Sequence, residues 1–237
     1  MSESNIAILD RVIQEINKSL EEVLSDISKD ELRKTSLLSL IGLSSEIGSG
    51  ILSLLKIGNC ESAVMLERNL YELWCEIRLL LDSSENDAAK LLYNSLEEVK
   101  SFYKNSDSEL KGKLRHVTEE LKTKFPNEET QIIKQREHGK FHWSGLSISS
   151  VIRKVAADSD TTIYKLLSWE SHASMICLRD RLYMEEEKLV IGSRMPSYME
   201  KEMIANRTGA YLYFIWNEFA EIFGFNEINE EEYNTSF

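Results

Sequence analysis

Arg68 and Glu72 are two charged residues in a stretch that is otherwise almost entirely apolar. They stand one helical turn apart within residues 63–81, so a helix places both on the same face. A buried charge is stable only when it is paired or neutralised. Two interpretations stay open: a structural ion pair that holds neighbouring helices in register, or a polar pocket that binds an anionic ligand.

Tyr164, Ser168 and His172 recur at four-residue intervals and predict a polar ridge along a helix. A Ser168–His172 dyad for nucleophilic catalysis lacks a recognisable nucleophile elbow, which favours a hydrogen-bond network instead. If His172 lies beside Arg68 and Glu72, the cluster combines a phosphate clamp with an acid–base group. We therefore take Arg68, Glu72 and His172 as candidate catalytic residues, and Tyr164 and Ser168 as candidate binding residues.

His138 and His142 are also four apart, which is a metal-ligand spacing on a helix. Gly139 lies between them and no third ligand adjoins, so we predict no metal and no cofactor. Arg136 and His142 fit the Arg-x4–6-His spacing of ribonucleases in the HEPN superfamily, in which Arg steadies the phosphate. So short a pattern arises often by chance and carries little weight alone.

The composition indicates helices. Only two of 237 residues are proline and ten are glycine, and 42% are hydrophobic. We predict an all-α, mostly antiparallel bundle of about seven to eight helices that forms a single domain over residues 1–237. The expected helical segments are 6–27, 30–55, 63–81, a fourth helix from 87 that residues 105–108 either interrupt at 103 or leave to continue over 109–125, a short segment 126–135, and 144–157, 161–178 and 197–223.

Residues 63–81 are apolar on nearly every side, which is typical of a central helix. Residues 183–194 fit either a short strand or a loop. The acidic tail, residues 225–237, is expected to be frayed.

The charge balance bears on the class of partner. The chain has 28 basic and 40 acidic residues, a net charge of −12, which disfavours broad nucleic-acid and anionic-membrane surfaces. A local basic pocket stays open as an alternative.

Other features predict a cytoplasmic protein. The apolar run at residues 35–55 contains Glu46 and several serines, so we expect no membrane span and no membrane partner. The N-terminus lacks the pattern of a secretory signal. Cys60, Cys75 and Cys177 are expected to be buried free thiols in a reducing compartment.

Several separated motifs carry a family resemblance. They are Gly-Ile-Leu-Ser-Leu-Leu-Lys-Ile-Gly at 50–58, the segment from Ala63 to Leu73, Trp-Ser-Gly-Leu-Ser at 143–147, and Tyr164-x3-Ser168-x3-His172-x-Ser174. Together, over residues 35–180, they resemble the bacterial helical family known as domain of unknown function 5677. The resemblance implies an all-α core. It singles out Arg68, Glu72, Trp143, Gly145, Tyr164, Ser168 and His172, with Trp143 as a further binding residue. It implies no activity.

Two functions from different classes remain. The first is an effector or toxin of a bacterial phage-defence or toxin–antitoxin system that cleaves RNA without a metal, by fold-level analogy to HEPN-like proteins. No Arg precedes His172 by four to six residues, so its Arg partner would come from another helix, and Arg68 is the best candidate. The second is a non-enzymatic module that binds a protein partner.

The last helix bears on assembly. Tyr211, Tyr213, Phe214 and Trp216 span more than one face of residues 197–223. We predict a two-fold homodimer through this helix. Tyr211, Tyr213 and Trp216 are also candidates for an exposed apolar patch.

Overall fold

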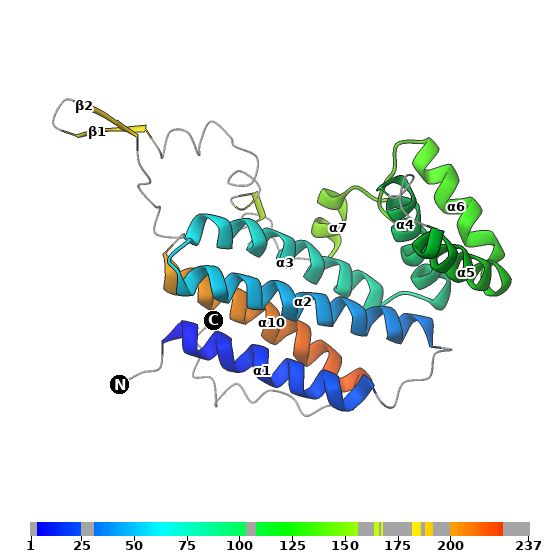
Figure 1. The fold of residues 1–237 in the computed structure, drawn as a ribbon, viewed down its shortest axis with the longest axis horizontal. Coiled ribbons are helices and arrows are strands. Elements are labelled where there is room, and N and C mark those ends of the chain that lie inside the picture. The colour runs from blue at the N-terminus through cyan, green and yellow to red at the C-terminus, as the bar shows by residue number, and fades with distance from the viewer. Residues whose placement is uncertain are drawn as a thin grey trace. The chain divides into compact units, whose positions relative to one another are not determined.

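The computed structural model describes residues 4–24, 31–102, 108–155, 164–165, 167, 182–185, 188–191 and 200–224. This part of the chain holds eight α-helices and one short β-hairpin. The helices are α1 (Asn5–Leu24), α2 (Leu32–Lys56), α3 (Cys60–Leu81), α4 (Glu85–Phe102), α5 (Ser108–Lys124), α6 (Pro126–Glu137), α7 (Ile148–Val155) and α10 (Lys201–Phe223). The all-α prediction is confirmed (Figure 1).

The ambiguous segment near residue 190 contains the hairpin. Strand β1 (Leu182–Glu185) pairs antiparallel with β2 (Lys188–Ile191), with Leu182 opposite Ile191. The strand interpretation of residues 183–194 is therefore right for this part.

The chain divides into two compact units. Unit 1 comprises Met1–Asp26, Ser39–Cys75 and Ala156–Phe237, and unit 2 comprises Ile27–Leu38 and Glu76–Val155. Two of the four boundaries fall within helices, after Leu38 in α2 and after Cys75 in α3. The prediction of a single domain therefore stays a prediction.

Unit 1 is built from α1, α10 and the parts of α2 and α3 that belong to it. Leu9, Ile16, Ile41, Ile51 and Leu70 are fully buried in its core. The consecutive helices α1, α2 and α3 alternate in direction (Figure 1), whereas α10 runs parallel to α1.

The parallel pairing is fixed at the two helix starts. The backbone N–H of Asn5 donates to Glu202 Oε2 at 2.9 Å, and Asn5 Nδ2 donates to the Glu202 carbonyl at 3.2 Å. These bonds satisfy one of the N–H groups that a helix start leaves without a partner.

Among the described helices, α2 is the one that is long and apolar enough to cross a membrane by length and composition alone. In the structure 44% of its most apolar window is buried inside the protein. A core helix passes the same test, and Leu37, Ile41, Ile51 and Leu55 on α2 are each fully buried.

Unit 2 consists of α4 to α7 with the start of α2 and the end of α3. Polar contacts connect its elements: Arg33 donates to the carbonyls of Leu81 and Ser83 at 3.0 and 3.1 Å. Asn86 on α4 donates to Glu128 on α6 at 3.0 Å.

Helix α7 begins four residues later than the sequence indicated. Gly145 has φ +73°, a left-handed conformation that non-glycine residues rarely adopt, so residues 143–147 form a loop. Ser147 then caps the helix, because its Oγ accepts from the N–H of Ser150 at 3.3 Å. The predicted helix 161–178 is described only at residues 164, 165 and 167, which are helical; its remainder and the tail 225–237 lie outside the described residues.

Candidate functional site

Arg68, Glu72 and Tyr164 form one polar cluster in unit 1, which we call the Arg68 cluster. Arg68 Nε donates to Glu72 Oε1 at 2.9 Å, and the Tyr164 hydroxyl donates to the same oxygen at 3.2 Å. The guanidinium lies 5.7 Å from the centre of the Tyr164 ring, within reach of a cation–π interaction. Two segments 92 residues apart, both from the family motifs, therefore meet here.

The cluster is partly shielded from solvent. The side chains of Arg68 and Glu72 are 17% and 28% exposed. Burial acts to lower the pKa of Arg68, but the charge of Glu72 and the Tyr164 hydroxyl outweigh it and hold that pKa above its usual value. Burial raises the pKa of Tyr164, and the Glu72 charge adds to this effect while Arg68 opposes it. Arg68 is a permanent cation, and Tyr164 is a neutral hydrogen-bond donor.

Aromatic side chains hold Tyr164 in place. Its ring stacks on Tyr71 with centroids 5.7 Å apart and an interplanar angle of 27°. Tyr71 in turn contacts Trp74 and Tyr211 at 5.5 and 5.4 Å. Tyr164 therefore lies between a charged pair and an aromatic group.

Two of the aromatic residues of α10 that the sequence indicated for an exposed patch are buried. Tyr211 and Trp216 are only 7% and 1% exposed, so they belong to the core of unit 1 and not to an exposed patch. Phe214, at 44%, is the large aromatic residue that α10 leaves exposed.

Next to the cluster, α3 and α10 share an ion pair that the sequence did not indicate. Arg207 donates from Nε to Glu67 Oε1 at 2.6 Å and from Nη2 to Oε2 at 2.7 Å. Glu67 is fully buried, and burial raises its pKa against the opposing effect of Arg207. The partners are 140 residues apart, so no local spacing could have revealed them.

We predicted that Arg68, Glu72 and His172 lie together. The structure brings Arg68 and Glu72 into contact, and Tyr164 joins them. His172, Ser168 and Cys177 lie outside the described residues, and the part of the prediction that concerns His172 stays a prediction. Cys60 and Cys75 are buried free thiols, as expected.

Trp143 belongs to unit 2, where it forms a hydrogen-bonded group with its neighbours. Its Nε1 donates to Glu76 Oε2 at 2.6 Å, and the other oxygen of Glu76 bonds His142 Nε2. His142 Nδ1 accepts from the N–H of Ser144 at 3.2 Å and lies 2.7 Å from the Ser144 hydroxyl. Because a backbone N–H can only donate, Nδ1 is the acceptor and Nε2 carries the proton toward Glu76.

Glu76 could have been found from the sequence. It stands one helical turn after Glu72, so residues 68, 72 and 76 continue a single row of charges along α3. Glu76, the last residue of this row, bonds Trp143 and His142 and so supports the Trp-Ser-Gly-Leu-Ser loop.

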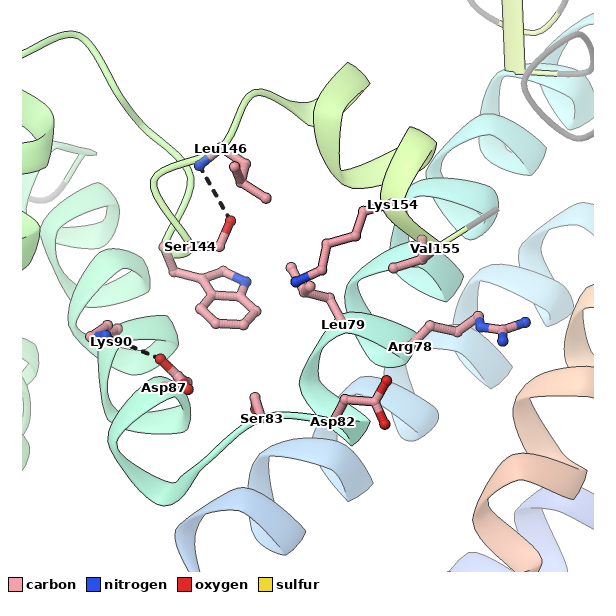
Figure 2. A pocket seen from close by; sticks show the side chains of 11 residues that line it. Arg78, Leu79, Asp82, Ser83, Asp87, Lys90, Ser144, Leu146, Lys154 and Val155 are labelled. Carbon is pink, nitrogen blue, oxygen red and sulfur yellow. Dashed lines mark hydrogen bonds and ion pairs between the residues drawn. The ribbon is translucent and has the colours of Figure 1, made fainter. Parts of the chain in front are cut away.

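Trp143 and Ser144 line a pocket of about 510 Å³ within unit 2 (Figure 2). Leu79, Leu146 and Val155 contribute apolar surface, and the remaining walls are polar or charged. Figure 2 shows Lys154 extending from α7 toward the middle of the pocket, while Asp87 and Lys90 come from α4.

Arg136 and His142 have different partners. Arg136 donates to Asn94 on α4 at 2.9 Å and lies 5.5 Å from the Phe141 ring, whereas His142 bonds Glu76 and Ser144. Within the described residues no group of three or more His, Cys, Asp or Glu side chains is arranged to hold a metal ion.

The comparisons with known proteins define the family. Residues 34–189 match the model of a family of unknown function, DUF5677, and the chain belongs to this family. The match includes the Arg68 cluster and the residues of the unit 2 pocket. The searches of curated proteins and of solved structures found no match.

Proposed function

We propose that this protein cleaves RNA without a metal ion, at a site in unit 1 built around Arg68. The observation that supports the proposal is the Arg68 cluster, in which two family motifs distant in sequence meet around a permanent cation. A cation of this kind stabilises the charge that develops on a phosphodiester during attack by the 2′-hydroxyl.

The roles follow from the chemistry of each group. Arg68 holds the scissile phosphate, and Glu72 orients the guanidinium until the anionic substrate shares it. His172 is the proposed acid–base group, because an imidazole can take the proton of the attacking 2′-hydroxyl and supply a proton to the 5′-oxygen that leaves as its bond to phosphorus breaks. Tyr164 and Ser168 supply hydrogen bonds to the bound strand.

The biological setting that we propose is a cytoplasmic effector of a bacterial phage-defence or toxin–antitoxin system. This part rests on analogy with HEPN-like helical ribonucleases and therefore on fold class alone. A net charge of −12 opposes unspecific binding to nucleic acid, which suits an enzyme that engages RNA through a small site.

The test is cleavage of end-labelled RNA in the presence of EDTA. We expect cleavage by the natural chain and its loss in His172→Ala at an unchanged melting temperature. His138→Ala, which alters an exposed histidine, is the matched control and keeps full activity. Inactivity of the natural chain on every RNA offered, or full activity of His172→Ala, would refute the proposal.

Arg68→Ala provides the second measurement. A purely structural pair predicts a stability loss of several kcal/mol, as removal of one partner from a shielded ion pair produces. Arg68→Lys keeps the charge but not the forked donor geometry. If Arg68 binds phosphate, Arg68→Lys lowers cleavage much more than it lowers stability.

A non-enzymatic interaction module is the second candidate. It is favoured by Met203 and Phe214 on α10, which are 46% and 44% exposed, because exposed large apolar residues often belong to binding surfaces.

A further inference from the structure

We infer that the pocket of unit 2 binds a nucleoside monophosphate. The pocket has a charged half and an aromatic half, and it lies in a different unit from the proposed RNA-cleaving site. The inference goes beyond the proposed function and does not depend on it.

The charged half carries both signs of charge. Lys90 and Lys154 line the pocket together with Asp82 and Asp87, whereas the side chain of Arg78 points away from its middle (Figure 2). The lysines are the groups that can attract an anion into this concave site.

One of the two carboxylates is already neutralised. Asp87 Oδ1 accepts from Lys90 at 3.0 Å, and its Oδ2 accepts from the hydroxyl and the N–H of Ser84 at 2.8 and 3.2 Å. These bonds keep the pKa of Asp87 below its usual value although burial acts to raise it. Asp87 and Lys90 therefore cancel each other within the wall.

Lys154 is the cation available to a ligand. It is exposed on α7, lines the pocket and makes no ion pair or hydrogen bond with a described residue. In Figure 2 its side chain reaches into the pocket from the opposite side to Asp87 and Lys90. A phosphate beside it gains a charge-assisted hydrogen bond without breaking one that Lys154 makes to a described residue.

The aromatic half is preorganised. The Trp143 indole is fixed through Nε1 to Glu76 at 2.6 Å and stacks on His142 with centroids 5.6 Å apart. Leu79, Leu146 and Val155 complete an apolar wall. A planar base is the ligand part that an aromatic and apolar wall of this kind accepts.

Size and polarity complete the match. A volume of about 510 Å³ lies within the range of small-ligand sites. Asp82 is exposed at the rim, and its carboxylate can accept hydrogen bonds from sugar hydroxyls. The base, the sugar and the phosphate each contact a wall of suitable chemistry. Inorganic phosphate or a nucleoside would contact only part of these walls.

Isothermal titration calorimetry of the full chain with 5′-AMP, adenosine and inorganic phosphate tests the inference. We expect AMP to bind at least about tenfold more tightly than either fragment, since each fragment loses one half of the contacts. Equal affinity for AMP and adenosine would overturn the role of the charged half. Equal affinity for AMP and phosphate would overturn the role of the aromatic half, and no heat with AMP would overturn the inference altogether.

Lys154→Ala is the deciding variant because the side chain is exposed and its loss leaves no buried partner. We expect it to weaken AMP binding by about tenfold or more while adenosine binding is unchanged. Lys134→Ala removes an exposed lysine of α6 that does not line this pocket, and its AMP affinity stays that of the natural chain. Equal affinities in the two variants would refute the assignment. The measurement requires no turnover, so its failure is distinct from a failure of the RNA-cleavage proposal.

Discussion

At the scale of single residues, the Glu67–Arg207 pair combines full burial of a carboxylate with two hydrogen bonds from one guanidinium. Taking a carboxylate out of water is unfavourable, and the attraction to Arg207 compensates only while both partners are present. The pair connects α3 to α10, two helices that are distant in sequence.

We predict that Arg207→Ala lowers the free energy of unfolding by about 3–5 kcal/mol, since Glu67 is left buried without its counter-charge. Urea titration followed by circular dichroism measures this change. The double variant Glu67→Leu/Arg207→Leu recovers much of the loss, because an apolar pair needs no compensation.

Arg115→Ala is the matched control, since Arg115 and Glu119 form a pair with side chains 81% and 59% exposed. Exposed pairs contribute little, so this variant unfolds at the same urea concentration as the natural chain. An Arg207→Ala variant as stable as Arg115→Ala would contradict the prediction.

The sequence could reveal Arg68 and Glu72 because both stand on one face of a strongly apolar stretch. Glu67 is adjacent to Arg68, but helix geometry turns it toward α10, where its partner lies. Lys154 belongs to a short helix with several polar residues, and only the pocket makes it distinctive. Glu67 and Lys154 could not be found from the sequence because their surroundings form only when the chain folds, and no local spacing of residues indicates them.

At the scale of elements, two glycines of α2 distinguish two effects of a substitution to alanine on stability: the gain in helix propensity and the cost of a steric clash. An added Cβ at Gly48 would meet Leu212 Cδ1 at 2.7 Å, with Ile13 at 3.6 Å. At Gly42 an added Cβ meets nothing within 4 Å. Helix α2 is therefore closely packed at Gly48 and not at Gly42.

We predict that Gly42→Ala raises the free energy of unfolding by about 0.5–1 kcal/mol through helix propensity alone. Gly48→Ala gains the same propensity but must displace Leu212, so its net stability is lower than that of Gly42→Ala. Thermal unfolding of the two variants side by side gives the comparison. Equal stabilisation by both substitutions would show that α2 is not closely packed at Gly48.

Long periodic helices were predictable because their apolar faces repeat over many turns, as in α1, α3 and α4. The predicted start of α7 at residue 144 was wrong. Gly145 is left-handed and Ser147 caps the helix, so α7 begins at Ile148. The sequence of residues 183–194 does not distinguish a strand from a loop, since strands of four residues such as β1 and β2 carry almost no periodic signal.

At the scale of the whole molecule, α10 keeps one exposed apolar stripe. Met203 and Phe214 are 46% and 44% exposed, and eleven positions bring them to nearly the same angle around the helix. Ala210, between them, is half-buried. Tyr211 and Trp216 are used inside unit 1, so this stripe is the part of α10 on which the homodimer prediction now rests.

We predict that the protein self-associates through this stripe as a two-fold dimer. Sedimentation at tens of micromolar measures it, with Phe214→Ser expected to shift the population to monomer. Phe141→Ser removes an aromatic residue of unit 2 that is 62% exposed and leaves the dimer intact.

Each copy carries a net charge of −12, and like charges repel across an interface. Added salt screens the repulsion between charges more than about 8–10 Å apart at moderate ionic strength, so the dimer tightens as salt increases. A natural chain that sediments as a monomer at every salt concentration contradicts the prediction, as does a Phe214→Ser variant that dimerises like the natural chain.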